Sequence, residues 1–213
     1  MSLNKKLLKK AKLYLILDGL VLSYRDLLVK LKPAVRSGVD IVQLRDKNGS
    51  GKDILEFCKQ AQRITQKKTL FIVNDRVDLA ILAGADGVHL GQEDISYAQA
   101  RKLMGPKAII GVSCQTKEQA LKAQAQGCDY IGFGSVFETQ TKPERQAMNL
   151  ELLKDVVKTI RIPVFAIGGI GRSNLDKVKE VGAKRVAVCR DILLAKDVAG
   201  AVKYLKKSLI AGT

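Results

Sequence analysis

Eight short apolar runs recur along the 213-residue chain, and a longer segment separates each run from the next. Most of the runs are almost continuously apolar, which is typical of parallel strands buried on both faces. The runs are Leu13–Leu17, Ile41–Arg45, Leu70–Asn74, Gly87–Leu90, Ile109–Ser113, Tyr130–Gly134, Val164–Gly168 and Arg185–Cys189. The pattern predicts an α/β fold in which eight strands alternate with helices.

Several of the intervening segments carry apolar residues at the spacing of an amphipathic helix. Thr116 stands at the start of one of them with Gln119 three residues later, which is the pattern of a capped helix N-terminus. The segments predicted to be helical are Asp53–Lys67, Thr116–Gln126, Leu150–Ile160 and Asn174–Val181.

The junction from helix to strand is itself repeated, and it is the strongest topological signal in the sequence. The pieces SGVD, AGADG, QGCDY and VGAKR each place a glycine shortly before a predicted strand. These glycines are expected at helix C-termini, because glycine adopts the left-handed conformation without a steric penalty. Eight strand–helix units favour a single (β/α)8 TIM barrel, and a doubly wound open sheet is the alternative.

No linker or low-complexity stretch divides the chain, so we expect one barrel domain over residues 1–213. Its first twelve residues are basic and are expected to form a helix or a tail. No stretch approaches the roughly 20 apolar residues that a membrane span needs, and the start lacks the features of a signal peptide. We therefore expect a cytoplasmic protein with no membrane partner. The four cysteines have no spacing typical of a metal or disulfide framework.

The net charge of +16 admits two classes of protein, a nucleic-acid binder and an enzyme that handles anionic substrates. Aromatic residues make up only 5% of the chain and tryptophan is absent, so platforms for base stacking are poorly supplied. Lysines recur singly on the predicted helices, which is typical of solvated faces. Charge alone does not decide between the two classes.

A barrel would place its active site at the C-terminal ends of the strands. The second strand ends in Gln43 and Arg45, with Lys47 in the loop that follows. Strand alternation directs Gln43 and Arg45 to the same face. Arginine binds phosphate oxygens through two N–H groups and lysine adds a point charge, so this end suits a phosphate. The alternative is a surface salt bridge with the intervening Asp46.

Carboxylates follow the next two strands. Asn74 and Asp75 end the third strand, and Asp94 lies in the loop after the fourth. Two carboxylates on neighbouring loops can hold Mg²⁺ if a substrate phosphate completes its coordination shell. The alternative is that these side chains cap the helices that follow.

The remaining candidates offer little acid–base chemistry. His89, the only histidine, lies inside the fourth strand, where a packed structural role is favoured over catalysis. Ser113 ends the fifth strand and either contacts substrate or caps the next helix. Cys114 has no evident histidine partner, so a thiol nucleophile is not expected.

The residues that follow the last three strands are of types that suit a second phosphate. The loop after the sixth strand carries Thr139, Thr141 and Lys142, a composition that suits closure over an anionic substrate. The glycines of AIGGIG after the seventh strand free backbone N–H groups for an anion, and Ser173 or Asn174 then opens a helix. Two phosphate sites with Mg²⁺ and no general base indicate displacement of a diphosphate.

These motifs resemble the thiamine phosphate synthase family from about Leu13 to Ile192. The pieces QLRDK, NDRVDLAILAGADGVHLGQED, TQTK and AIGGI occur in the family's order and spacing. The resemblance implies a Mg²⁺-dependent transferase that joins hydroxymethylpyrimidine diphosphate to a hydroxyethylthiazole phosphate. It implies a dissociative reaction in which diphosphate leaves first and the thiazole nitrogen captures the pyrimidine cation.

The resemblance also assigns residues. It implies that Asp75 and Asp94 bind the metal and that Arg45, Lys47, Ser113 and Lys142 are catalytic. The residues implied for the pyrimidine diphosphate are Gln43, Arg45, Lys47, Asn74, Ser113 and Lys142. Those implied for the thiazole phosphate are Thr139, Thr141, Gly169, Cys189 and Arg190. Small phosphorylated substrates would be the partners, with no specific nucleic acid, and homo-oligomerisation is left open.

Two departures from the family pattern keep alternatives open. Arg190 and Asp191 stand where the family usually has a Ser-Ala pair, so a hydroxyl contact to phosphate is lost there. The piece FET is similar to the thiazole tautomerases, a sister family that uses a histidine after the fifth strand, where this chain has Gln115. A non-catalytic basic barrel that binds nucleic acid or a regulatory partner is the alternative from another class.

Overall fold

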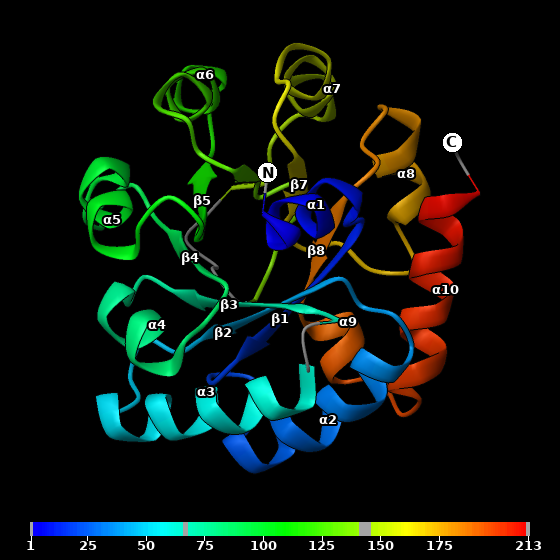
Figure 1. The fold of residues 1–213 in the computed structure, drawn as a ribbon. Helices are drawn as coiled ribbons and strands as arrows, with labels where there is room; N and C mark the ends of the chain where they lie inside the picture. Colours follow the sequence, from blue (N-terminus) through cyan, green and yellow to red (C-terminus); the bar gives the residue numbers. More distant parts are fainter. Residues whose placement is uncertain (1, 66–67, 141–145, 212–213) are drawn as a thin grey trace.

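The computed structural model describes residues 2–65, 68–140 and 146–211, and within them eight parallel strands close into a barrel. The strands pair in chain order, and β8 pairs with β1 to complete the ring (Figure 1). They are β1 Leu13–Asp18, β2 Ile41–Arg45, β3 Leu70–Asn74, β4 Gly87–Leu90, β5 Ile109–Cys114, β6 Tyr130–Phe133, β7 Val164–Ile167 and β8 Val186–Val188. The predicted (β/α)8 barrel is confirmed, and the open sheet is wrong.

Helices surround the barrel and connect its strands (Figure 1). They are α2 Tyr24–Arg36, α3 Gly51–Thr65, α4 Val77–Ala83, α5 Tyr97–Met104, α6 Lys117–Gln126, α7 Leu150–Thr159 and α8 Leu175–Glu180, with α9 Arg190–Leu193 and α10 Val198–Ile210 after β8. Within the described residues, none of these helices has the length and apolar character that crossing a membrane requires.

Helix α6 shows how local sequence sets the element boundaries. The Thr116 side chain accepts from the Gln119 amide while the Gln119 side chain returns to the Thr116 backbone, which forms the predicted capping box. The helix ends at Gly127, which has a φ of 88°. Such a left-handed conformation is costly for residues with a Cβ, so the glycine fixes where the chain turns back into β6.

Strand alternation divides the apolar side chains into two layers. Leu13, Leu15 and Leu17 point outward from β1 and pack in the large cluster between strands and helices. Tyr14 and Ile16 point inward and join the smaller cluster that fills the barrel. The helices are therefore held by one set of side chains, and the barrel interior is built from the other.

The aspartates of the repeated junction fasten neighbouring strands at the N-terminal end of the barrel. Asp40, Asp86 and Asp129 directly precede β2, β4 and β6. Each carboxylate accepts a backbone N–H from the preceding strand of the barrel, and the donors are Leu13, Phe71 and Ile110, all at 2.9 Å. The junction motif thus satisfies amides that the strand ladder leaves without a partner.

Helix α1, Leu3–Lys10, closes the same end of the barrel. Its Leu8 and the following Ala11 are buried in the interior cluster. Asn4 donates to Asp86 at 2.7 Å, and Lys5 pairs with Asp129 at 2.8 Å. The basic N-terminal segment therefore includes a capped helix that shields the interior from water.

A close approach inside the barrel requires a glycine on β5. A Cβ on Gly111 would overlap the ring of Tyr130, which is fully buried on the neighbouring strand β6. The ring has no room to withdraw, because it packs against Tyr14 and Phe165 with centroid separations of 5.9 and 5.6 Å.

We predict that Gly111→Ala lowers the free energy of unfolding by about 1–3 kcal/mol, because the added methyl overpacks a rigid interior. Chemical denaturation measures the change. Gly51→Ala at the start of α3 is the matched control, because a Cβ there meets only an arginine nitrogen at 3.7 Å. The control should be unchanged or more stable by at most about 1 kcal/mol. Equal stability of the two variants would contradict the packing argument.

Candidate active site

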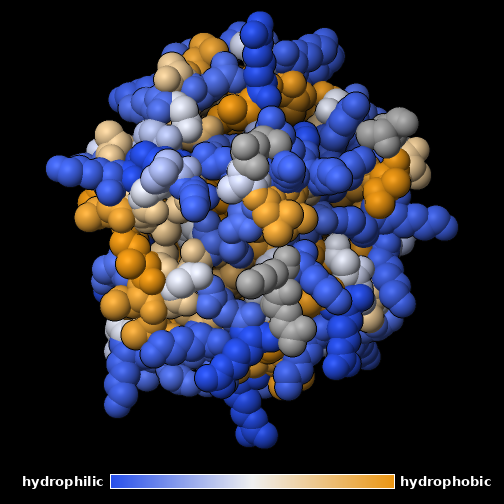
Figure 2. Space-filling model, in the orientation of Figure 1, coloured by the Kyte–Doolittle hydropathy of each residue, from blue (hydrophilic) through white to orange (hydrophobic). Residues whose placement is uncertain are grey.

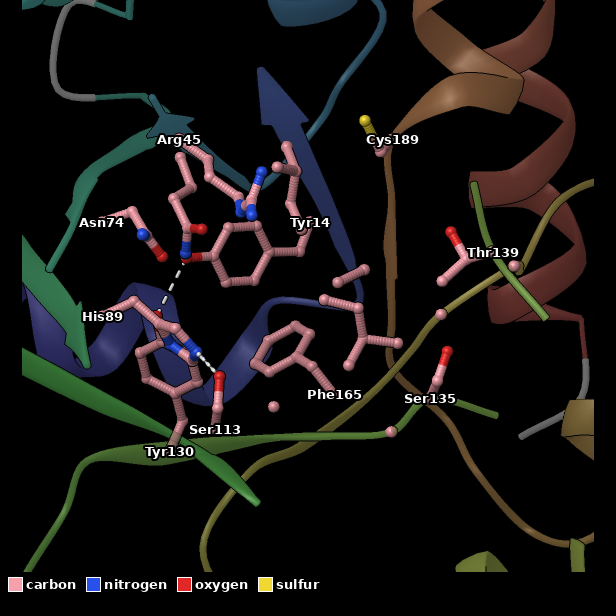
Figure 3. A pocket seen from close by; sticks show the side chains of 18 residues that line it. Tyr14, Arg45, Asn74, His89, Ser113, Tyr130, Ser135, Thr139, Phe165 and Cys189 are labelled. Carbon is pink, nitrogen blue, oxygen red and sulfur yellow. Dashed lines mark hydrogen bonds between the residues drawn. The ribbon is translucent and has the colours of Figure 1, made fainter. Parts of the chain in front are cut away.

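A cavity of about 100 Å³ lies at the C-terminal mouth of the barrel and is lined from all eight strand ends. Figure 3 shows its side chains converging from different strands. The polar and aromatic members are Tyr14, Gln43, Arg45, Asn74, His89, Ser113, Tyr130, Ser135, Thr139, Phe165 and Cys189. Six residues expected from the sequence to bind substrate, namely Gln43, Arg45, Asn74, Ser113, Thr139 and Cys189, are thus brought together, and Gly169 lines the same cavity.

A chain of four hydrogen bonds crosses the floor of this cavity. Gln43 Nε2 donates to the Tyr14 hydroxyl at 2.7 Å, and that hydroxyl lies 2.9 Å from the hydroxyl of Tyr130. Tyr130 lies 3.0 Å from His89 Nδ1, and His89 Nε2 lies 2.9 Å from Ser113 Oγ (Figure 3). The chain links β2 to β5 through the barrel interior.

The first donor fixes one end of this chain. An amide NH₂ only donates, so Tyr14 accepts from Gln43, and we infer that Tyr14 directs its own proton toward Tyr130. With that direction, Tyr130 would donate to Nδ1 of His89, and Nε2–H of His89 would donate to Ser113. Burial raises the pKa of both phenols above the ordinary value, which keeps their protons in place. The Gln43 carbonyl and the Ser113 proton are left to face a ligand.

His89 makes contacts that its place in a strand did not predict. It is buried as expected, yet it lines the cavity and holds Ser113. Ser113 does not cap the next helix, because Thr116 does.

Arg45 is held by a buried carboxylate. Its Nη1 donates to Asp18 Oδ2 at 2.7 Å, and Asp18 is fully buried at the end of β1. The alternative of a salt bridge with Asp46 is wrong, because Asp46 instead accepts from Tyr24 and from two amides of its own loop. Arg45 Nε is buried and has no hydrogen-bond partner among the described residues. An unsatisfied buried N–H costs about 1–3 kcal/mol, so this guanidinium is suited to an anionic ligand.

Two carboxylates and a lysine meet beside the cavity. Asp75 follows β3 with a φ of 61°, and its amide donates to the His89 carbonyl at 2.8 Å. It forms an ion pair with Lys47. Burial, and then the neighbouring Asp94, raise the pKa of Asp75. The left-handed backbone and the like-charge neighbour are both unfavourable, as is common where a site is built for a ligand.

The alternative in which these carboxylates cap helices is wrong. Helix α4 begins after Arg76 without a side-chain cap, and α5 is capped by Ser96. Asp94 instead accepts from the Gly91 amide at 2.6 Å within its own loop.

The donor set fits Mg²⁺. No group of three or more histidine, cysteine, aspartate or glutamate side chains gathers in the part of the chain that the structure describes. Mg²⁺ needs fewer protein ligands, because it is bound through one or two carboxylates together with substrate phosphates and water. The hollow that Asp75 and Asp94 line also contains Lys47, Asn74 and Ser113, so it adjoins the cavity.

The glycine loop after β7 forms the other wall of the cavity. Gly168 and Gly169 have φ values of 102° and 62°, and a Cβ on Gly169 would overlap the backbone of Glu138. Asn174 fastens the loop, because it donates to the Gly169 carbonyl and accepts from the Gly171 amide, both at 2.9 Å. The expectation that Asn174 opens a helix holds for its position, but its side chain makes no cap bond to α8.

The remaining expected substrate-binding residues are Lys47, which lines the adjoining hollow, and Arg190, Thr141 and Lys142. Arg190 begins α9 and is absent from the residues that line the cavity. Its neighbour Asp191 pairs with Arg172 at 3.0 Å. Thr141 and Lys142 lie outside the described residues.

Sequence reasoning missed the aromatic part of the site. Tyr14, Tyr130 and Phe165 lie within apolar runs and read as core residues, although they line the cavity. Strand alternation could have identified them. Their side chains point into the barrel from β1, β6 and β7, on the same inner face as the side chains of Gln43 and Arg45 on β2.

The chain is similar to known proteins over most of its length. The model of the thiamine monophosphate synthase family matches residues 13–192. The thiamine-phosphate synthase of Clostridioides difficile is 41% identical over 203 residues, which cover 94% of this chain and 97% of that protein. The Synechococcus enzyme of the same name is 45% identical over 206 residues, 96% of this chain but 58% of that longer protein.

Solved structures give the same result. A thiamine phosphate pyrophosphorylase from Pyrococcus furiosus matches with a TM-score of 0.86 and 35% identity, covering 99% of both chains. A 3-hexulose-6-phosphate synthase, at 19% identity and a TM-score of 0.68, shares the fold alone. The family model and the relatives together show that this chain belongs to the thiamine monophosphate synthase family.

Proposed function

We propose that the cavity joins hydroxymethylpyrimidine diphosphate to hydroxyethylthiazole phosphate, and releases thiamine phosphate and diphosphate. The carbon–oxygen bond to the diphosphate breaks, and the thiazole nitrogen forms the new bond to that carbon. The observation that carries the proposal has two parts. Arg45, whose buried Nε has no partner among the described residues, lines an aromatic-walled cavity, and the Asp75–Asp94 pair lies in the hollow that adjoins this cavity.

The pyrimidine ring is proposed to lie on the hydrogen-bond chain. Its amino group would donate to the Gln43 carbonyl, and a ring nitrogen would accept from Ser113. Tyr14 and Phe165 meet edge to face with a centroid separation of 5.4 Å and offer apolar surface to the ring. Arg45, Lys47, Asn74 and Lys142 would bind the diphosphate, and we propose that Arg45, Lys47, Ser113 and Lys142 are catalytic.

Asp75 and Asp94 are proposed to hold Mg²⁺, which would neutralise negative charge on the diphosphate. Lys47 is already paired with Asp75, so it lies where it can contact the same oxygens. The like charge of Asp94 against Asp75 favours a cation at this point.

The thiazole phosphate is proposed to bind at the glycine loop. Thr139, Thr141, Gly169, Cys189 and Arg190 are its candidate contacts, and Cys189 and Gly169 line the cavity. Because Arg190 begins α9 outside the cavity lining, we expect it to contribute less than the loop does.

A dissociative order of steps suits these residues. Both ring nitrogens of His89 are hydrogen-bonded, to Tyr130 and to Ser113, so the histidine positions rather than removes a proton. Expulsion of diphosphate from a stabilised pyrimidine cation needs no general base. Gln115 stands where the tautomerase reaction would need a histidine, so that reaction is not proposed.

Location and assembly remain predictions from the sequence, namely a cytoplasmic protein that binds no specific nucleic acid and whose homo-oligomerisation is left open. Figure 2 shows apolar surface at the left, over α4 and α5. Ile81, Leu82 and Leu103 are its large exposed side chains on these helices. Light scattering reports the oligomeric state.

A direct assay tests the proposed function. The purified chain is mixed with Mg²⁺ and both phosphorylated substrates, and thiamine phosphate is read by oxidation to its fluorescent thiochrome. Product that disappears on addition of EDTA supports the reaction and the metal together. A folded protein that forms no product would overturn the proposal.

Asp75→Asn should lower turnover at least about tenfold, since loss of even an outer-shell partner costs that much at metal sites. The amide keeps the size of the side chain but removes the charge that binds Mg²⁺. Steady-state kinetics at rising Mg²⁺ measure the effect, and circular dichroism checks the fold. Asp78→Asn is the control, because Asp78 pairs with Arg76 on the exposed face of α4. Equal activity of the two variants would remove Asp75 from the metal site.

Arg45→Lys should raise KM for the pyrimidine diphosphate while KM for the thiazole phosphate stays unchanged. Lysine retains the charge that pairs with Asp18 but lacks the planar fork that binds phosphate through two N–H groups. Arg45→Ala is a poorer test, because it leaves Asp18 buried without its partner, at a cost of about 3–5 kcal/mol in stability. An unchanged KM for both substrates in the lysine variant argues against the assignment.

The hydrogen-bond chain predicts the tautomer of His89. Nδ1 should carry no proton and Nε2 should carry one, because the donors run from Gln43 to Ser113. The chain has one histidine, so ¹⁵N-histidine NMR of untagged protein reports this ring alone. Tyr14→Phe should scramble the tautomers and raise KM for the pyrimidine diphosphate. Tyr97→Phe, whose hydroxyl bonds the Gly127 carbonyl at the surface, should do neither. A proton on Nδ1 in the unaltered protein would reverse the proposed polarity.

A further inference from the structure

The repeated strand junction at the N-terminal end of the barrel changes at its fourth copy. In three copies the second residue after the glycine is an aspartate, whose carboxylate accepts an amide of the neighbouring strand. The fourth copy reads VGAKR, so Lys184 takes the place of the aspartate. Lysine has no acceptor, and it reverses the charge at this junction.

Strand register identifies the amide concerned. In the other copies the donor directly precedes the residue that pairs with the residue after the aspartate; for example, Phe71 precedes Ile72, which pairs with Gly87, the residue after Asp86. The residue after Lys184 is Arg185. Ala166 pairs with Val186, so one step back Phe165 stands opposite Arg185. The donor equivalent to Phe71 is therefore Val164. Its amide faces the junction where Lys184 has replaced the carboxylate.

A cleft lies at this junction, and cations line it. Val164, Lys9, Arg161, Lys184 and Arg185 contribute to its wall, and no carboxylate does so within the described ranges. None of the four cations forms an ion pair with a carboxylate in the described part of the chain. Three are exposed, and Arg185 is partly buried.

Arg185 shows that the cleft is built around a positive charge. Its Nη2 donates to the Lys9 carbonyl at 3.1 Å, whereas its Nε is buried without a hydrogen-bond partner in the described structure. Burial lowers the pKa of Arg185, with no carboxylate to offset the effect. A guanidinium held in this way favours an anion that accepts from Nε.

We propose that this cleft binds a phosphate-type oxyanion, whose oxygens take the place that the aspartate carboxylate holds in the other three copies. The Val164 amide, the Arg185 guanidinium and the side chains of Lys184, Lys9 and Arg161 are its ligands. Four cations exceed the charge of one carboxylate, so a multiply charged anion is the better match. The site lies at the opposite end of the barrel from the catalytic cavity, and it does not depend on the proposed reaction.

NMR of the ¹⁵N-labelled full chain tests the proposal with inorganic phosphate at constant ionic strength. The Val164 amide and the Arg185 Nε–H resonances should shift and saturate together. Lys184→Asp should abolish both shifts, because its carboxylate restores the pattern of the other copies and occupies the site. The same variant should melt at a higher temperature than the unaltered chain without phosphate.

Lys122→Asp, on the exposed surface of α6, changes the net charge equally and should keep both shifts. Arg161→Gln provides a second cleft variant if Lys184→Asp does not fold, and it should weaken the shifts. The proposal is overturned if phosphate shifts only resonances of the catalytic cavity, such as the Gly169 amide. It is equally overturned if Lys184→Asp responds to phosphate as the unaltered chain does.

Discussion

Closure of eight parallel strands determines most of what this protein can do. Every second side chain of a closed barrel points into a space without bulk water, so each inward residue must either be apolar or find a partner inside. In the lower half of this barrel the inward residues are apolar and α1 covers them. In the upper half several of them are polar, and Arg45, Gln43 and Ser113 each have a partner on another strand. The candidate active site thus lies in this half of the barrel interior.

Two kinds of polar partnership occupy this half. One is the ion pair of Arg45 with the fully buried Asp18, which holds a cation beside the cavity while leaving Nε available. The other is the chain from Gln43 to Ser113, which contains no carboxylate, lysine or arginine. The first suits a diphosphate and the second a neutral heteroaromatic ring. The two halves of the proposed substrate would therefore be recognised by different interactions. Positive charge would bind the diphosphate, and the direction of the hydrogen bonds would select the ring.

The opposite end of the barrel uses the same means for stability. Aspartates before β2, β4 and β6 bind amides of the preceding strands, and α1 contributes Asn4 and Lys5 to two of them. The change to Lys184 before β8 interrupts this pattern at one place. In three copies of the junction an aspartate accepts a backbone N–H. The fourth copy lacks this carboxylate, so we infer that an external anion can accept there instead. At this junction, replacing the aspartate by a lysine changes a position that stabilises the barrel into one that we propose binds a ligand.

The sequence by itself determined the elements and their order. Apolar runs, the Thr116 cap and the junction glycines act over a few residues, so they are readable without a fold. They also placed Arg45, Asp75 and Ser113 at strand ends. Only the tertiary structure decided the contacts between these residues, because Asp18 meets Arg45, and His89 meets Ser113, through strand register and barrel closure. Because the barrel closes, Tyr14 and Tyr130, which look like core residues in the sequence, form the floor of the candidate site. Inward and outward positions of a doubly buried strand are equally apolar, so only closure shows which of them face a ligand.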